Sequence, residues 1–388
     1  MATCGRGFRG GRRLGLALAL AAALATTACA TGAIHQAGSG PARSYGGWCQ
    51  TRSTAAWRRV LSNHIVPLSR TTSLVPFALA PNGRSFFADV RSPRFSGVAR
   101  IGSGAHAMTE VKAFPVPDTY QADGSFDGRW FVWYEYHGFS SFDDFKIYAW
   151  DSRTGRVQRI GAAARGPTGE LWNSPWQGPD VRNGLATWAQ GSGPNGLTKV
   201  HVYDLDARRD RVIHVGHTEG PFLLPHRLVA WAESPRRGAF AQMFVANALT
   251  GKRTKAPPAL RGLRGISGLD TDGRQIAYPS ARFKSLWWSP SLRARPTEIL
   301  AARGLNTIDN SVQIGGRYVG FGIQPPLFLA DTATQRYLEI ERQYGYTELN
   351  ANALLVAYGN NTRKKLEFRS HVVVVPLRAL PRMPACNS

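Results

Sequence analysis

The sequence predicts an all-β fold, a seven-bladed β-propeller, with six or eight blades as the alternatives. Seven times along the chain, a small polar turn is followed at once by a short aromatic and β-branched run, which is typical of a strand. The shortest step between the third residues of successive turns, from Arg317 to Ala353, is 36 residues, and the longest, from Arg129 to Gly184, is 55. Strand repeats of this length form sheets arranged radially around an axis.

The chain begins with a segment typical of an export signal. Four arginines precede the uncharged run LGLALALAAALA at 14–25, which at about twelve residues is too short to span a bilayer. We therefore expect a signal peptide at residues 1–28. Arg12 and Arg13 also permit the twin-arginine export route, so both this route and the general secretory route stay open.

Cys29 directly follows small residues at the end of this apolar run, and this order resembles the lipobox of bacterial lipoproteins. An aliphatic residue usually stands where this chain has Thr26. The resemblance implies that Cys29 becomes the first mature residue and carries a lipid, which would hold the protein at the outer face of the cytoplasmic membrane. Ordinary cleavage after Ala28 or Ala30, which would give a secreted protein, is the alternative.

Residues 29–46 are rich in Gly, Ala and Ser and predict a flexible tether, because such a stretch cannot bury a core. We expect residues 47–388 to form one propeller domain. Within it, only 53–66 is a plausible helix. Ser53 or Thr54 would cap this helix, and we expect it to pack across one end of the ring.

Four cysteines are present. Cys4 would leave with the signal peptide and Cys29 would be acylated, which leaves Cys49 and Cys386 near opposite ends of the folded part. Export places both where disulfides persist. Because a closed propeller brings its first and last strands together, we expect a Cys49–Cys386 disulfide that clasps the ring shut. Two free thiols are the alternative.

The chain carries a formal net charge of +23, from 48 basic and 25 acidic residues. Only eight of the basic residues are lysines, a balance that a GC-rich genome also produces. A strongly basic exported domain is attracted to phosphate-rich polymers and anionic lipids in a salt-dependent way. Export and the lack of an aromatic-basic recognition motif argue against nucleic acid as a partner.

One repeat is especially clear. The turn at 127–129 precedes the strand WFVWYEY, and after a loop and a second strand the turn at 151–155, DSRTG, precedes an outer strand. A DGR-type turn before the second strand and a D-x-x-T-G-type turn before the fourth together resemble the TolB-type, WD40-like propeller repeat, over roughly residues 70–380. Related repeats form the propeller of dipeptidyl peptidase IV-like enzymes. The turns at 225–227 and 351–353 depart from this pattern because they lack the Asp-Gly pair.

Sequence motifs for catalysis are missing. No G-x-S-x-G, H-E-x-x-H or C-x-x-C is present. A metal site would need loops to bring scattered histidines together, and we expect neither a metal nor another cofactor. The histidines in question are His201, His214, His217 and His226.

Two groups of residues are the candidate ligand-binding residues. Asp143 and Asp144 lie in the loop HGFSSFDDF, where paired carboxylates suit a cation or acid–base chemistry, although a solvated loop is the simpler interpretation. Trp172 and Trp176 lie in an insertion of the third repeat, TGELWNSPWQ. Exposed aromatic rings there would stack on sugars or pack on a protein.

We expect a monomeric, non-enzymatic binding or scaffold protein anchored at the envelope, which recognises a protein or glycan through loops at one face of the ring. The resemblance to TolB implies that the partner is another envelope protein. The alternative is a propeller enzyme of lyase type, with or without a metal, that acts on a cyclic peptide or polysaccharide in the central channel.

Overall fold

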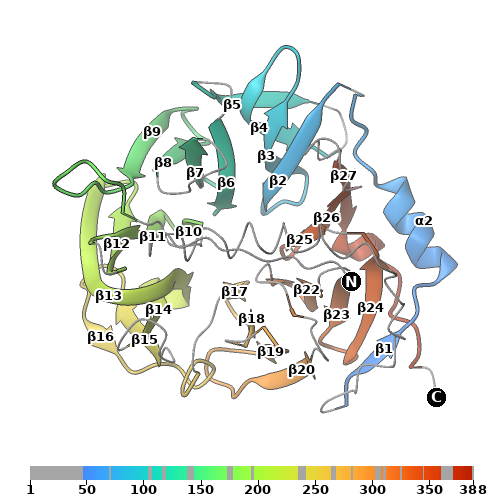
Figure 1. The fold of residues 1–388 in the computed structure, drawn as a ribbon. Helices are drawn as coiled ribbons and strands as arrows, with labels where there is room; N and C mark the ends of the chain where they lie inside the picture. Colours follow the sequence, from blue (N-terminus) through green and yellow to red (C-terminus); the bar gives the residue numbers. More distant parts are fainter. Residues whose placement is uncertain are drawn as a thin grey trace, which may run out of the picture.

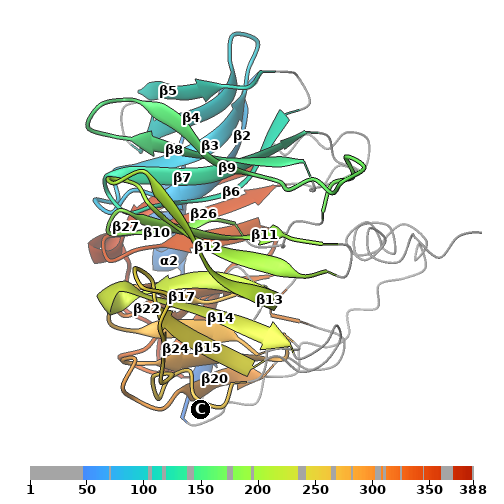
Figure 2. The same cartoon turned by 90° about the vertical axis from the view of Figure 1, so that its left-hand side faces the viewer.

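The structure is a computed structural model that describes residues 47–386 except for 70, 104–106, 116–118, 138–143, 173–177, 194–195, 235–241, 264–267, 281–282, 302–306, 309–311, 324–325, 344 and 360–369. Its sheets are arranged around a central axis, and β6, β10, β17 and β25 lie towards the centre (Figure 1). This confirms the β-propeller. Seen from the side, the strands of successive sheets cross the ring from one face to the other (Figure 2).

Three sheets have four antiparallel strands in chain order. They consist of β2 (Ser73–Leu79), β3 (Ser85–Arg91), β4 (Ser96–Gly102) and β5 (Met108–Ala113); of β6 (Thr119–Phe126), β7 (Trp130–His137), β8 (Phe145–Asp151) and β9 (Val157–Ala162); and of β17 (Asp270–Thr271), β18 (Ile276–Pro279), β19 (Ser285–Ser289) and β20 (Thr297–Ala301). The strands expected in the clearest repeat are therefore confirmed.

One sheet has seven strands, and within it a short 3₁₀ helix, η1 (Pro225–Arg227), connects the fourth strand to the fifth. The strands are β10 (Asp180–Arg182), β11 (Leu185–Gly191), β12 (Thr198–Asp204), β13 (Arg209–Leu224), β14 (Leu228–Ser234), β15 (Gln242–Asn247) and β16 (Arg253–Thr254). Within β13, residues 209–216 pair with β12 and residues 217–224 pair with β14. Each half therefore belongs to a four-stranded unit, and the number of blades stays a prediction.

The last two sheets hold the ends of the chain. In the five-stranded sheet, β1 pairs in parallel with β24, and the short 3₁₀ helix η2 follows the three-stranded sheet. The elements are β1 (Cys49–Thr51), β21 (Gln313–Gly315), β22 (Tyr318–Gly322), β23 (Leu327–Asp331) and β24 (Arg336–Glu341); then β25 (Gly345–Leu349), β26 (Ala353–Gly359), β27 (Ser370–Pro376) and η2 (Leu377–Ala379).

Hydrogen bonds between the segment 64–66 and β27 close the ring. Val66 N–H donates to the Val372 carbonyl at 2.7 Å, and Val374 N–H donates to the His64 carbonyl at 3.1 Å. Ile65 forms an antiparallel bridge with Val373. The chain then continues from this outer edge of the last sheet into β2 of the first sheet.

The helix α2 (Ala55–Asn63) lies within the predicted range, and the Thr54 side chain caps it by accepting from Trp57 N–H at 3.5 Å. It lies on the outer rim of the ring, beside β27 and β24, rather than across one end as expected (Figure 1). Trp57, which is fully buried, explains this position because its ring packs among apolar side chains of the last two sheets. No helix of the described residues is long and apolar enough to cross a bilayer.

The predicted Cys49–Cys386 disulfide is confirmed, with Cα atoms 5.9 Å apart. It does not join the first and last sheets as expected, because β1 adds to the five-stranded sheet. The C-terminal tail reaches that sheet through Arg336, whose guanidinium donates to the carbonyls of Met383 and Pro384 at 3.4 and 3.1 Å. The bond therefore ties both ends of the chain to one sheet, while the segment 64–66 closes the ring.

The core is divided into clusters between neighbouring sheets. Phe87 of β3 stacks on Phe131 of β7 with ring centroids 4.0 Å apart, and Phe131 stacks on Trp133 at 5.0 Å. All three side chains are fully buried. Burying such rings contributes on the order of 1.5–3 kcal/mol each, so the aromatic strands predicted from the repeats hold adjacent sheets together.

Candidate functional site

The two faces of the ring differ in their connections. Each innermost strand ends at a short turn such as 127–129, and turns such as 151–155 lie at the same face, which we call the tight-turn face. The second strand of each unit ends, as at His137, and the fourth strand ends, as at Ala162, at the opposite face, which we call the long-loop face. Loops that carry binding residues on a rigid scaffold are common functional sites.

At the long-loop face, the structure brings two predicted regions together through Arg165. Its guanidinium lies 3.5 Å from the Asp144 carboxylate and donates to the Gly169 carbonyl at 3.1 Å. Arg165 also forms a β-bridge with Leu171, directly before Trp172. Asp144 and the Trp172 loop therefore form one polar and aromatic surface.

The turn at 166–170 in this surface is tightly held. The Glu170 carboxylate accepts from the Thr168 hydroxyl at 2.5 Å and from the Thr168 N–H at 3.1 Å. The Thr168 hydroxyl is the main cause that lowers the pKa of Glu170, and the nearby Trp172 indole contributes, although its N–H lacks well-formed hydrogen-bond geometry. Glu170 is therefore an ionised, oriented acceptor beside a half-buried Trp172 ring.

Of the other predicted site residues, Asp143, Trp176 and Cys29 lie outside the described residues. The predictions for ligand binding and lipidation at these positions stay predictions. Asp144 is partly exposed, and among the described residues its side chain contacts only Arg165.

A second group of polar residues, which the sequence analysis missed, surrounds the axis of the ring on the innermost strands. These carboxyl groups are Asp123 of β6, Asp180 of β10, Glu219 of β13, Asp270 of β17 and Glu348 of β25. Burial is the main cause that raises the pKa of each, to about 6 for Asp123 and Asp270 and well above the usual value for Glu348. Asp123 keeps solvent-exposed surface, but it lies inside the ring, where the surrounding protein removes enough water to raise its pKa.

The aspartates of this group bind backbone groups of the next four-stranded unit round the ring. Asp180 accepts from Leu223 N–H of β13 at 2.7 Å, and Asp270 accepts from Ile314 N–H of β21, also at 2.7 Å. A backbone N–H of Gly178 lowers the pKa of Asp123 in the same way, although burial outweighs it. These carboxyl groups therefore link adjacent four-stranded units at the centre of the ring.

The two glutamates differ from the aspartates. No side-chain hydrogen bond or ion pair is seen for Glu219 or Glu348 among the described residues. Besides burial, the negative charges of Asp123 and Asp270 raise the pKa of Glu348. Glu219 and Glu348 are therefore the carboxyl groups near the axis that are free to meet a ligand.

One cation lies among these acids. Arg182 of β10 donates from its guanidinium to the Thr271 carbonyl of β17, two inner strands further round the ring. Its positive charge opposes the rise in the pKa of both Asp180 and Asp270. Arg182 therefore crosses the central region near the tight-turn face and partly neutralises the carboxyl groups.

Of the histidines considered as metal ligands, three lie in strands, namely His201, His214 and His217, and His226 lies in η1. His201 stacks on Trp188 with ring centroids 5.0 Å apart, and its Nδ1 lies 2.9 Å from Asp210. His214 stacks on Trp231 at 5.1 Å, and its Nε2 lies 3.1 Å from Glu233. Within the described ranges, no group of three or more His, Cys, Asp or Glu side chains is placed to hold a metal ion.

No family model matches the chain, and no curated protein matches it. Solved structures do match, and the likeness at these low identities shows the fold alone. A prolyl endopeptidase aligns at 13% identity and TM-score 0.53 over 86% of this chain, which spans 50% of the endopeptidase's own length. Oligogalacturonate lyase from Vibrio parahaemolyticus aligns at 9% identity and TM-score 0.51, covering 79% and 91% of the two chains.

A third match is the β-propeller domain of Cps50 (Swd1) from Myceliophteria thermophila, at 10% identity and TM-score 0.50, covering 80% of this chain and 98% of that one. The three matched proteins differ in kind. The propeller implied by the repeats is therefore supported, and function must be argued from the site residues.

Proposed function

We propose that this protein is a non-enzymatic binding protein that recognises a protein or glycan partner with its long-loop face. The observation that carries the proposal is the surface formed by Asp144, Arg165, Glu170 and Trp172. It combines an oriented acceptor, a charged pair and an aromatic ring on loops supported by rigid sheets. These groups match what sugars and protein surfaces offer, namely hydroxyl and amide hydrogen bonds and apolar faces for stacking.

The aspartates of the innermost strands and the histidines of the sheets have structural contacts, and these support binding over catalysis. Asp180 and Asp270 hold backbone N–H groups of neighbouring four-stranded units, and His201 and His214 stack within their own sheets. These contacts give each of the four groups a structural role within the ring. We further propose that acylated Cys29 and the tether at 29–46 hold the ring at the membrane surface. The confirmed disulfide supports export, because disulfides persist outside the cytoplasm.

Photo-crosslinking in intact cells tests the binding proposal. A photoreactive phenylalanine analogue replaces Trp172 in the full chain, and the matched control places it at Arg153, which is exposed on the tight-turn face. We expect one defined adduct from position 172 that is absent from position 153 and is lost when Arg165→Glu is added. Equal adducts from both positions, or none from position 172, would contradict the proposal.

The second candidate function is a lyase-type enzyme acting near the axis of the ring, and Glu219 and Glu348 favour it. Both are carboxyl groups with raised pKa and no partner among the described residues, and perturbed carboxyl groups of this kind serve as acids or bases. One matched propeller is an oligogalacturonate lyase. Elimination from polygalacturonate, followed through the absorbance of the unsaturated product and lost in Glu348→Gln, would establish this candidate over the first.

A further inference from the structure

A cavity of about 340 Å³ lies between two segments at the rim of the ring. Pro258 and Arg261 line one side, in the segment 255–263 that follows β16, and Arg295 and Pro296 line the other, in the turn between β19 and β20. Figure 1 shows β16 and β20 on the outside of the ring. Two arginines, from segments next to different sheets, therefore border one pocket.

The walls of this pocket are anchored in the core. Ala259 N–H donates to the Leu292 carbonyl at 3.1 Å, which ties the two segments together, and the Tyr278 hydroxyl donates to the Ala259 carbonyl at 3.2 Å. Ala259 and Leu260 are fully buried. Because the proline rings also fix the backbone on each side, the pocket is preorganised before any ligand arrives.

The charge of the pocket is positive and uncompensated. Arg261 and Arg295 are exposed, and among the described residues neither guanidinium has an ion pair or hydrogen bond. Lys255 and Arg293 add two exposed cations from the same segments, and neither 255–263 nor 290–296 contains an acidic residue. Most arginines whose side chains have a hydrogen-bond or ion-pair partner among the described residues, such as Arg129, pair with a carboxylate.

We propose that this pocket is a binding site for a phosphate group, held between the guanidinium groups of Arg261 and Arg295. Guanidinium forks donate paired hydrogen bonds that match the oxygens of phosphate, and two of them balance its charge. A lipid headgroup and a soluble phosphate compound both carry this group, and they are the two alternative ligands of the site. The site lies apart from the long-loop face and does not depend on the function proposed for that face.

The place of the pocket favours the lipid headgroup as the source. The β19–β20 turn belongs to the tight-turn face. Gly47, the first described residue, lies at the same face, because Cys49 N–H donates to the Gln335 carbonyl in the turn before β24 at 3.0 Å. If Cys29 is acylated as proposed above, the tether enters the ring at the same face as Arg295, which places the pocket on the side of the attachment point.

The test uses the chain without residues 1–29, so that neither the predicted signal peptide nor an acyl group contributes to vesicle binding. One arm measures inorganic phosphate by calorimetry at fixed ionic strength. The other measures sedimentation with phosphatidylglycerol vesicles, and phosphatidylcholine vesicles serve as the reference. Each arm compares Arg261→Ala and Arg295→Ala with Arg293→Ala, which removes an equal charge from the same turn but does not line the pocket.

We expect Arg261→Ala and Arg295→Ala each to weaken binding by about tenfold or more, and Arg293→Ala to change it less than about twofold. Vesicle binding that inorganic phosphate displaces identifies a lipid headgroup, and phosphate binding without vesicle binding identifies a soluble ligand. Equal losses in all three variants would mean diffuse attraction and would overturn the site, as would no binding of either probe. Unchanged thermal unfolding of the variants shows that the fold is kept, and Arg261→Lys should restore only part of the affinity.

Discussion

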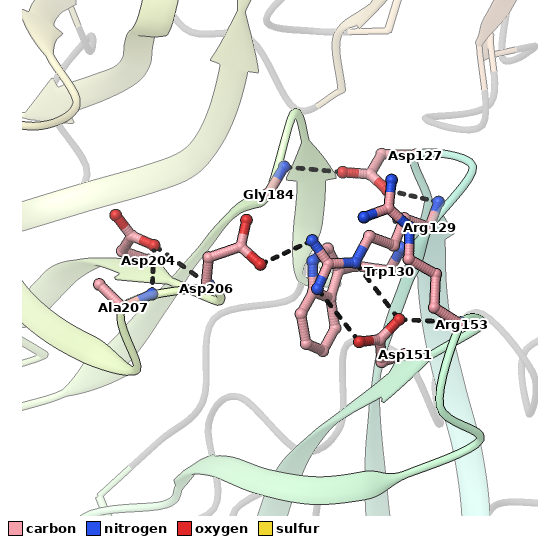
Figure 3. Close-up of polar contacts among 9 residues, drawn as sticks. All are labelled: Asp127, Arg129, Trp130, Asp151, Arg153, Gly184, Asp204, Asp206 and Ala207. Atoms are coloured by element: carbon pink, nitrogen blue, oxygen red, sulfur yellow. Dashed lines mark hydrogen bonds and ion pairs between the residues drawn. The ribbon is translucent and has the colours of Figure 1, made fainter.

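Arg129 donates two hydrogen bonds to the Asp151 carboxylate, from Nε to Oδ1 at 3.3 Å and from Nη2 to Oδ2 at 3.1 Å (Figure 3). The two residues belong to the two recurring turn motifs of the repeat, so the motifs occur together because their side chains meet. Arg129 also reaches Asp206 of the neighbouring unit at 2.7 Å. Arg317 and Asp331 form a similar pair at 3.4 Å. The repeated arginine thus connects turns within a sheet and between sheets.

Replacing Arg129 should lower the thermal stability of the ring. Burial opposes ionisation of Asp151, but the hydrogen bonds from Arg129 and from the Arg153 N–H, with the nearby positive charges, lower its pKa overall. Arg129→Ala leaves this nearly covered carboxylate without its cation, and we expect a melting temperature lower by about 2–4 °C. Arg153→Ala is the control because the Arg153 contact with Asp151 uses its backbone. Equal melting temperatures for the two variants would contradict this role.

Removing the disulfide should destabilise the domain without unfolding it. The bond closes a sequence separation of 337 residues, for which the chain-entropy model gives on the order of 5 kcal/mol as an upper value. Because the bonds of the segment 64–66 to β27 remain, the double variant Cys49→Ser, Cys386→Ser should keep a β-type circular dichroism spectrum and melt at a lower temperature. Loss of the β-type spectrum at room temperature would show that the bond itself closes the ring.

The helix α2 should contribute to stability chiefly through one side chain. Trp57 is fully buried against the last two sheets, and its indole N–H donates to the Arg382 carbonyl at 3.3 Å. Trp57→Ala should reduce the free energy of unfolding by about 3–5 kcal/mol, because it leaves a large cavity. Arg59→Ala, on the exposed side of the same helix, should have little effect in the same denaturant titration. A similar loss in both variants would argue against this packing.

Asp270 should make stability depend on pH in the acid range. Burial raises its pKa in the folded protein to about 6, from 3.8 for an unperturbed aspartate, so the folded state binds more protons than the unfolded state between these values. Stability from this group is therefore complete below about pH 4 and is lost as the pH rises towards 6. Asp270→Asn should flatten this part of the melting-temperature profile, whereas Asp272→Asn in the exposed turn should not. Parallel profiles for wild type and Asp270→Asn would refute the assignment.

Cys29 should carry the lipid if the protein is anchored as proposed. Metabolic labelling with a fatty acid should mark the wild type and leave Cys29→Ala unmarked, because the thiol is the acceptor. Cys4→Ala serves as the control, since Cys4 lies in the predicted signal peptide. Label in both Cys29→Ala and the wild type, or in neither, would exclude acylation at this position.

The sequence predicted the strands well because their signals are local. A turn signal at 127–129 precedes a β-branched and aromatic run from Trp130 to Tyr136, and β7 has nearly the same bounds as this run. Long-range relationships were harder to predict. No local pattern indicates that β1 pairs with β24 or that the segment 64–66 pairs with β27, since these contacts depend on the closed ring.

The site was predicted only in part for a related reason. Asp144 and Trp172 stood out as unusual residues in loops, but their connection through Arg165 required the structure. Four of the five inner carboxyl groups were missed because each is a single acid in a short strand, and Glu219 was missed because it lies inside the long strand β13. Asp180 and Asp270 both lie four residues before the third turn residue of their repeat, so comparing the repeats position by position would have revealed them.

The pairing of the segment 64–66 with β27 sets an order for folding. This segment is synthesised early, whereas its partner strand, Ser370–Pro376, is among the last parts of the domain to be synthesised. The intervening sheets must therefore assemble while the first and last faces of the stack are still uncovered. Ring closure becomes the final step of vectorial folding, and a chain truncated before β27 would leave two apolar sheet faces open to chaperones, proteases and other copies of itself.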